Sequence, residues 1–158
     1  MKRTIITTIL ATAILTSCGR EDAKTSIEVI SVWDKKEGML IDIEGESGEE
    51  KSFVCNKNST HERNLGDNVY RAFRDAAELN RVAFKNFITL FGQFKDECGG
   101  IPDSFKNEQE VAYCDSLKTE YEGVPQYNVI LGFPKGKKIA CSRIKDIRTV
   151  RERSGEAK

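Results

Sequence analysis

Alternating apolar and polar positions predict strands in the first part of the chain. Residues 26–33 and 39–43 are β-branched and apolar, and a short charged turn separates them, as in a β-hairpin. A third such segment, residues 51–55, follows an acidic turn. We therefore expect three antiparallel strands, followed by a polar loop over residues 56–66.

The apolar spacing becomes helical after Asp67, which we expect to act as the N-cap of a long helix. The helix should run to Glu97 and stop at Gly99-Gly100. At 1.5 Å per residue it would be about 46 Å long, more than a compact domain of this size covers. We expect that it kinks or that one end protrudes.

The apolar face of this helix consists of Phe73, Ala76, Ala77, Phe84, Phe87, Ile88, Phe91 and Phe94. Asn80 lies within that face, where its amide should have a structural role and hydrogen-bond to the second helix or to a strand.

The remaining pattern predicts a shorter helix and two strands. Ser104 should cap the second helix, and residues 127–133 and 138–144 should form a hairpin around Pro134. The charged segment 145–158 is expected to fray. The fold class is therefore α+β: an antiparallel sheet of about five strands, in the order βββααββ, packed on one long phenylalanine-rich helix and a shorter second helix.

The first residues have the pattern of an export signal. Lys2 and Arg3 precede an apolar run, and residues 4–17 are well short of the roughly 20 apolar residues that a membrane-spanning helix requires. The run ends in Leu15-Thr16-Ser17-Cys18, which resembles the lipobox of bacterial lipoproteins.

This resemblance implies that residues 1–17 are removed and that Cys18 carries diacylglycerol and fatty chains such as palmitate. Such acylation is enough for stable membrane attachment. Gly19 instead of aspartate at the next position implies sorting to the outer membrane, facing the periplasm. Residues 18–26 would then form a tether, residues 27–144 one globular domain, and residues 145–158 a charged tail.

The four other cysteines are expected to form two disulfides, because their number is even and export leads to an oxidising compartment. Three connectivities are open. We favour Cys55 with Cys141, which would tie two strand segments, and Cys98 with Cys114, which would tie two neighbouring helices. Zinc binding is disfavoured because no two cysteines have the spacing of a metal knuckle.

Charge and composition exclude several functions. The chain has 25 basic and 25 acidic side chains, and loss of Lys2 and Arg3 leaves 23 basic against 25 acidic, a balance near −2, so nucleic-acid binding is not indicated. The single histidine, His61, is expected in an exposed loop, without a catalytic triad. The acidic run from Asp42 to Glu50 lacks the glycine and the glutamate of a calcium loop, which favours a solvated turn.

These observations favour a non-enzymatic envelope lipoprotein that binds another envelope protein as an inhibitor, assembly factor or exclusion factor, with no cofactor or metal. One alternative is a cell-wall or lipid hydrolase that uses paired carboxylates. Another is a carrier with an apolar cavity between sheet and helix. The predicted binding surface consists of the exposed side of the second helix and a basic stretch that faces either lipid or protein. Its residues are Tyr113, Leu117, Tyr121, Lys135, Lys137, Lys138, Arg143 and Arg148.

Overall fold

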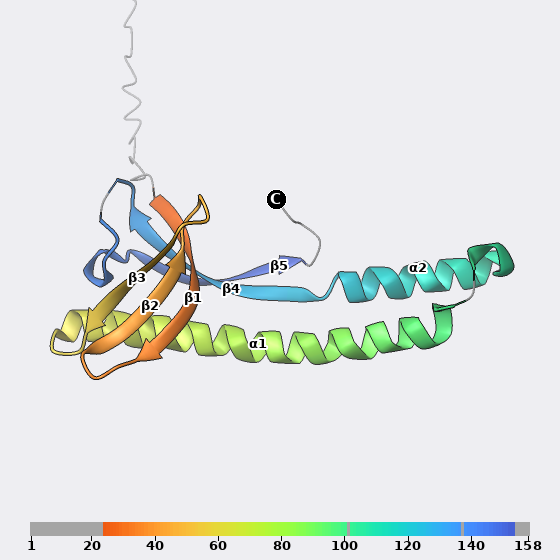
Figure 1. The fold of residues 1–158 in the computed structure, drawn as a ribbon, viewed down its shortest axis with the longest axis horizontal. Coiled ribbons are helices and arrows are strands. Elements are labelled where there is room, and N and C mark those ends of the chain that lie inside the picture. The colour runs from red at the N-terminus through yellow and green to blue at the C-terminus, as the bar shows by residue number, and fades with distance from the viewer. Residues whose placement is uncertain (1–23, 101, 137, 154–158) are drawn as a thin grey trace, which may run out of the picture.

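The computed structural model describes residues 24–100, 102–136 and 138–153 (Figure 1). The expected signal segment and Cys18 lie outside these residues. The predicted α+β class and the order βββααββ are confirmed. The strands are β1 (Lys24–Asp34), β2 (Gly38–Glu44), β3 (Glu50–Asn56), β4 (Pro125–Pro134) and β5 (Asp146–Arg153). The helices are α1 (Thr60–Cys98) and α2 (Glu108–Glu122), with short 3₁₀ turns η1 (Asp103–Phe105) and η2 (Cys141–Arg143).

The five strands form one antiparallel sheet in the order β3-β2-β1-β4-β5. Side chains alternate between its two faces, and the buried apolar side chains of the strands lie on the face that is covered by α1. The core between sheet and helix includes Ile27, Val29, Met39, Ile41, Ile43, Val69, Ala76, Val129, Leu131 and Phe133.

Only the first part of α1 covers the sheet. The helix has 39 residues and is therefore about 58 Å long at 1.5 Å per residue. Its second half extends past the sheet and pairs with α2 in an antiparallel hairpin (Figure 1). We call residues 80–98 of α1 together with α2 the helical arm. Of the two outcomes expected for an overlong helix, protrusion of one end is the one observed.

The start of α1 differs from the prediction. The helix begins at Thr60, so the segment expected to be a polar loop is largely helical. Ser59 is the N-cap, and its hydroxyl accepts a hydrogen bond from the backbone N–H of Glu62. Asp67 lies inside the helix and caps nothing. Its neighbour Gly66 explains why this turn can approach the sheet, because a Cβ at that position would lie 3.1 Å from the side chains of Cys55 and Met39.

Two later elements also differ from the prediction. The N-cap of α2 is Asn107 instead of Ser104, and it forms a reciprocal capping box with Glu110. The returning strand is β5, whereas residues 138–144 contain η2 and no strand. The globular domain therefore extends to Arg153, past the boundary predicted at Ile144. The physical reason is the pairing of Cys141 with Cys55, which directs this segment to the end of β3 before the chain returns beside β4.

Both favoured disulfides are present in the structure. Cys55 is bonded to Cys141, which joins the end of β3 to η2, and Cys98 is bonded to Cys114, which joins α1 to α2 within the arm. All four cysteines are buried. One disulfide thus lies in the main core, and the other lies in a small separate core at the outer part of the arm.

Asn80 occupies the position where β4 loses one of its neighbours. β1 pairs with β4 only as far as Glu28 opposite Ile130, and then the two strands diverge. Beyond that point the Asn80 amide bonds both backbone groups of Tyr127: Nδ2 donates to the carbonyl oxygen and Oδ1 accepts from the N–H, each at 2.8 Å. The predicted hydrogen bonding of this amide to a strand is confirmed. Asn80 replaces the missing strand as the partner of β4.

Replacing Asn80 by alanine is expected to lower the free energy of unfolding by about 1–3 kcal/mol, because both groups of Tyr127 lose their partner. Asn86→Ala is the matched control, since Asn86 is an exposed amide on the same helix and should change stability by less than about 0.5 kcal/mol. Urea unfolding followed by circular dichroism measures both values. Equal stability of the two variants would contradict this role.

Within the described part of the chain, no helix is both long enough and apolar enough to span a bilayer.

Candidate functional site

The most conspicuous surface of the molecule is a row of aromatic rings along the arm. Phe84, Phe87 and Phe91 follow one another on α1, with stacked rings whose centroids are 6.4 Å and then 5.6 Å apart. Tyr121 of α2 packs against Phe87, Phe91 and Phe94 at centroid distances of 5.3–5.9 Å. We call the rings of Phe84, Phe87 and Phe91, with the adjoining Ile88, the aromatic ladder.

The ladder is only partly covered by α2. Phe84 is 62% exposed, and Ile88 and Phe91 are also exposed. Tyr121 of α2 covers one side of this apolar stripe, and the other side remains open to solvent. The opposite flank of α1 carries Val82, which is 56% exposed and lies about 160° around the helix from Phe84 at 3.6 residues per turn. Val82 therefore lies outside the ladder, on another flank of the helix.

A cleft opens where the ladder meets the body of the protein. It has a volume of about 380 Å³ and is lined by Asn80, Ala83, Phe84, Phe87, Val124, Pro125 and Gln126. The cleft lies between α1 and the first residues of β4. Apolar clefts of this size accept a large side chain of a partner. The ladder and the cleft therefore form one apolar surface that ends in a recess.

The outer part of the arm is fixed by covalent and polar contacts. The Cys98–Cys114 disulfide packs with Leu117 and Phe94. Nearby, the Tyr113 hydroxyl donates to Oε2 of Glu97 at 2.5 Å, and this bond to a carboxylate raises the pKa of Tyr113 above its usual value. These contacts hold the two helices together at the end that is farthest from the sheet.

The predicted binding residues on α2 have different environments. Tyr113 is exposed, as expected. Leu117 is only 6% exposed and packs in the arm core, so its assignment to a binding surface is wrong. Tyr121 is half-buried beneath the ladder. The reason is the pairing of α2 with α1, which uses the stripe of α2 that was expected to be available.

The predicted basic residues lie far from α2. Lys135, Lys138, Arg143 and Arg148 are exposed on the body, and Lys137 lies outside the described residues. The turn with Lys135 follows the end of β4, where Pro134 pairs with Lys24 at the start of β1. Figure 1 shows that this end of the sheet and the arm lie on opposite sides of the molecule. The structure therefore does not combine the two halves of the predicted surface.

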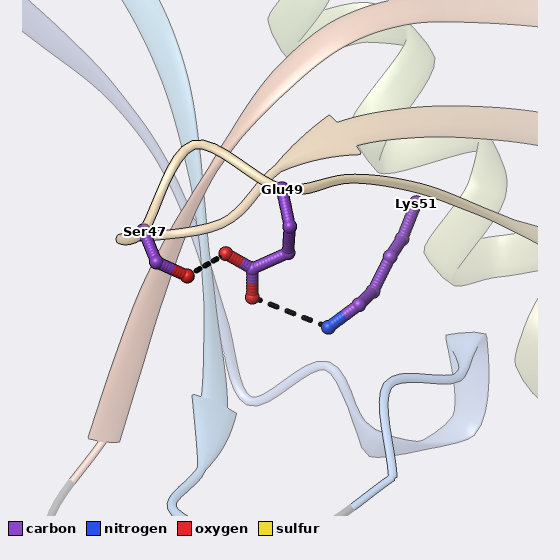
Figure 2. A network of polar contacts seen from close by, with 3 residues as sticks. All are labelled: Ser47, Glu49 and Lys51. Atoms are coloured by element: carbon purple, nitrogen blue, oxygen red, sulfur yellow. Dashed lines mark hydrogen bonds and ion pairs between the residues drawn. The ribbon is translucent and has the colours of Figure 1, made fainter.

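The acidic turn between β2 and β3 is engaged in its own contacts. Figure 2 shows Glu49 between Ser47 and Lys51: the Ser47 hydroxyl donates to its carboxylate, and Lys51 Nζ lies 3.2 Å from Oε1. The Ser47 bond is the main cause that lowers the pKa of Glu49 to about 2. Among the described residues, no group of three His, Cys, Asp or Glu side chains is placed to hold a metal ion. Residues 46–50 are all exposed, as expected for a solvated turn.

Carboxylates do gather in one cleft beside this turn, with a volume of about 490 Å³. Its lining residues are Ser26, Glu28, Glu44, Gly45, Glu46, Ile130 and Glu152. Pairing of two such acids for hydrolysis would require their carboxylates to lie about 5 to 10 Å apart. His61 does not contribute there, since it is exposed on the first turn of α1.

No protein-family model, curated protein or solved structure matches this chain.

Proposed function

We propose that the protein is a bacterial lipoprotein, anchored by acylated Cys18 to the outer membrane and facing the periplasm, where it binds another envelope protein without catalysing a reaction. The domain would hang on the short tether that precedes β1. A lipid anchor keeps such a domain near one surface and raises its effective concentration for partners there. The aromatic ladder is the proposed contact.

The exposure of the ladder is the observation that carries this proposal. Monomeric proteins rarely expose a continuous apolar patch without a function for it. Aromatic side chains dominate the energetics of protein interfaces, and Phe84, Ile88 and Phe91 stand together on one flank. An amphipathic helix of a partner could lie along the arm and complete a three-helix bundle, with one large apolar side chain in the cleft at the root.

Replacing Cys18 by serine is expected to abolish acylation and to move the protein from the membrane fraction to the soluble fraction. The thiol is the group that receives the lipid, and serine offers none. Mass spectrometry of the mature N-terminus and membrane fractionation measure both effects. A mature N-terminus at another residue, without fatty chains, would refute the lipoprotein assignment.

A photo-crosslinking amino acid at position 88 of the full-length chain is expected to give one discrete protein adduct in the bacterium that produces it. The same amino acid at position 82 is the matched control, because this exposed position lies on the other flank of α1. Phe84→Ala should weaken the contact by about 2 kcal/mol, or roughly 30-fold, if the ring acts as an interface hot spot. Equal adducts from both positions, or none, would contradict a specific ladder contact.

A further inference from the structure

A second exposed aromatic site lies on the face of the sheet that α1 does not cover. Trp33 on β1 is 58% exposed. It stands opposite Leu40 of β2, and Leu40 stands opposite Val54 of β3. With strands about 4.8 Å apart, this row forms an apolar strip roughly 10 Å wide across three strands.

A polar row runs beside the apolar one. Ser31, Asp42 and Ser52 face each other on the same three strands. Ser31 Oγ donates to Asp42 Oδ2 at 2.5 Å, and Ser52 Oγ donates to Oδ1 at 2.7 Å. The two rows are two residues apart along each strand, or roughly 7 Å. An aromatic face and a carboxylate with hydroxyl neighbours are thus placed side by side.

The polar row also fixes the orientation of the tryptophan. Trp33 Nε1 donates to Ser31 Oγ at 2.8 Å and to Asp42 Oδ2 at 3.2 Å. The ring is therefore held by its polar edge while most of its surface stays open to solvent. Fixing a side chain before binding reduces the entropy cost of association. The two hydrogen bonds of Trp33 therefore order its exposed ring, and an ordered ring is what a preformed binding site requires.

The negative charge of Asp42 also suits a binding site. Hydrogen bonds from Ser31 and Ser52 are the main causes that lower its pKa below the usual value, so the carboxylate is ionised at neutral pH. Its three hydrogen bonds leave about one of its roughly four lone-pair positions for another donor. Hydrogen bonds from a neutral hydroxyl to an ionised carboxylate are about twice as strong as those between neutral groups.

We propose that this platform binds a chain of β-linked hexosamine sugars, with one pyranose ring stacked on Trp33 and its hydroxyl or amide groups bonded to Asp42 and Ser52. A pyranose has an apolar C–H face and a rim of hydroxyl donors, which match the aromatic row and the polar row respectively. The site itself rests on the geometry alone. Only the choice of a cell-wall sugar rests on the proposed function in the envelope.

A sugar fits these observations better than a protein partner does. Protein hot spots are surrounded by contacts that exclude water. Trp33 instead has an ionised carboxylate and two hydroxyls on one side, and more than half of its surface is exposed. An aromatic ring together with a few fixed polar groups is typical of sites that bind small ligands, in which the polar groups set the orientation of the ligand.

Trp33 itself supplies the measurement, because it is the only tryptophan of the chain. Mature lipidated protein, in a detergent without a sugar headgroup, is titrated with the tetramer of β-1,4-linked N-acetylglucosamine. We expect a saturable blue shift of the fluorescence. Asp42→Asn and Ser52→Ala should each weaken binding, the former about tenfold, while Val82→Ala should leave the titration unchanged. Sedimentation with insoluble peptidoglycan tests binding to the polymer. The unaltered protein should sediment with it, whereas the Trp33→Ala variant should stay in the supernatant.

The results separate this proposal from the proposed function. Absence of a shift with the tetramer, together with no cosedimentation of the unaltered protein, would overturn the sugar site even if Cys18 is acylated. Unchanged binding by both Asp42→Asn and Ser52→Ala, with unaltered melting temperatures, would also overturn it. A photo-crosslinker at position 54 that captures a protein in place of peptidoglycan would assign the platform to a protein. Tetramer binding by a chain that proves not to be acylated would support the site and refute the lipoprotein assignment.

Discussion

Replacing both Cys55 and Cys141 by alanine is expected to lower the free energy of unfolding by about 4.5 kcal/mol. The two residues are 86 positions apart in the chain, so the crosslink removes much of the conformational entropy of the unfolded state. It also connects the edge strand β3 to the segment before the other edge strand, β5. Urea unfolding of the double variant measures the change as a lower midpoint with a similar slope.

The second disulfide provides the control for this result. Cys98 and Cys114 are only 16 positions apart, and the chain-entropy relation then gives about 3 kcal/mol. Their bond lies in the separate core of the arm, so we expect its loss to loosen the arm first and to leave the sheet folded. An equal loss of sheet signal in the two double variants would contradict the separation into two cores.

Phe133→Ala is expected to cost about 3–5 kcal/mol of stability. Phe133 is fully buried on β4 and meets Phe53 of β3 edge to face, at a centroid distance of 6.0 Å. Its removal leaves a cavity between strands that are not neighbours in the sheet, and relaxation fills such a cavity only in part. Thermal and urea unfolding of the purified variant provide the measurement.

Phe84→Ala is the matched control for Phe133→Ala, since it removes the same ring from an exposed site. We expect a stability change near 0.5 kcal/mol or less, although the same substitution should weaken partner binding. A large loss of stability from Phe84→Ala would indicate that the ladder is part of the folding core. Its proposed role as a contact surface would then be refuted.

The fold was predictable where local periodicity and burial agree. The first three strands alternate between core and solvent, and the spacing of Phe73, Ala76 and Phe84 is helical, so the patterns specify both elements. The disulfide pairing that the expected topology favoured among three open connectivities is also the one present. Where local and tertiary preferences differ, the prediction failed. The returning strand was assigned to residues 138–144, but β5 is a charged edge strand whose pairing with β4 is set by tertiary contacts.

The candidate sites were less predictable than the fold. The length of α1 already indicated a protruding end, and from this the exposure of Phe84 and Ile88 could have been inferred. The burial of Leu117 depends on the partner helix, which a single-helix pattern does not define. The Trp33 platform combines residues from three strands, so its geometry depends on the strand register, which the sequence pattern alone leaves open.

The helical arm is secured at both ends, by Asn80 against β4 at its root and by the Cys98–Cys114 bond at its far end. Fraying of a projecting hairpin usually starts at such a far end. Here the aromatic ladder lies between the Asn80 hydrogen bonds and the disulfide, so we expect its rings to have the same arrangement before and after a partner binds. The entropy cost of ordering them then belongs to folding and not to binding. We therefore expect the backbone of the arm to move little when a complex forms on it. Changes in affinity among variants of the ladder should then appear mainly in the dissociation rate.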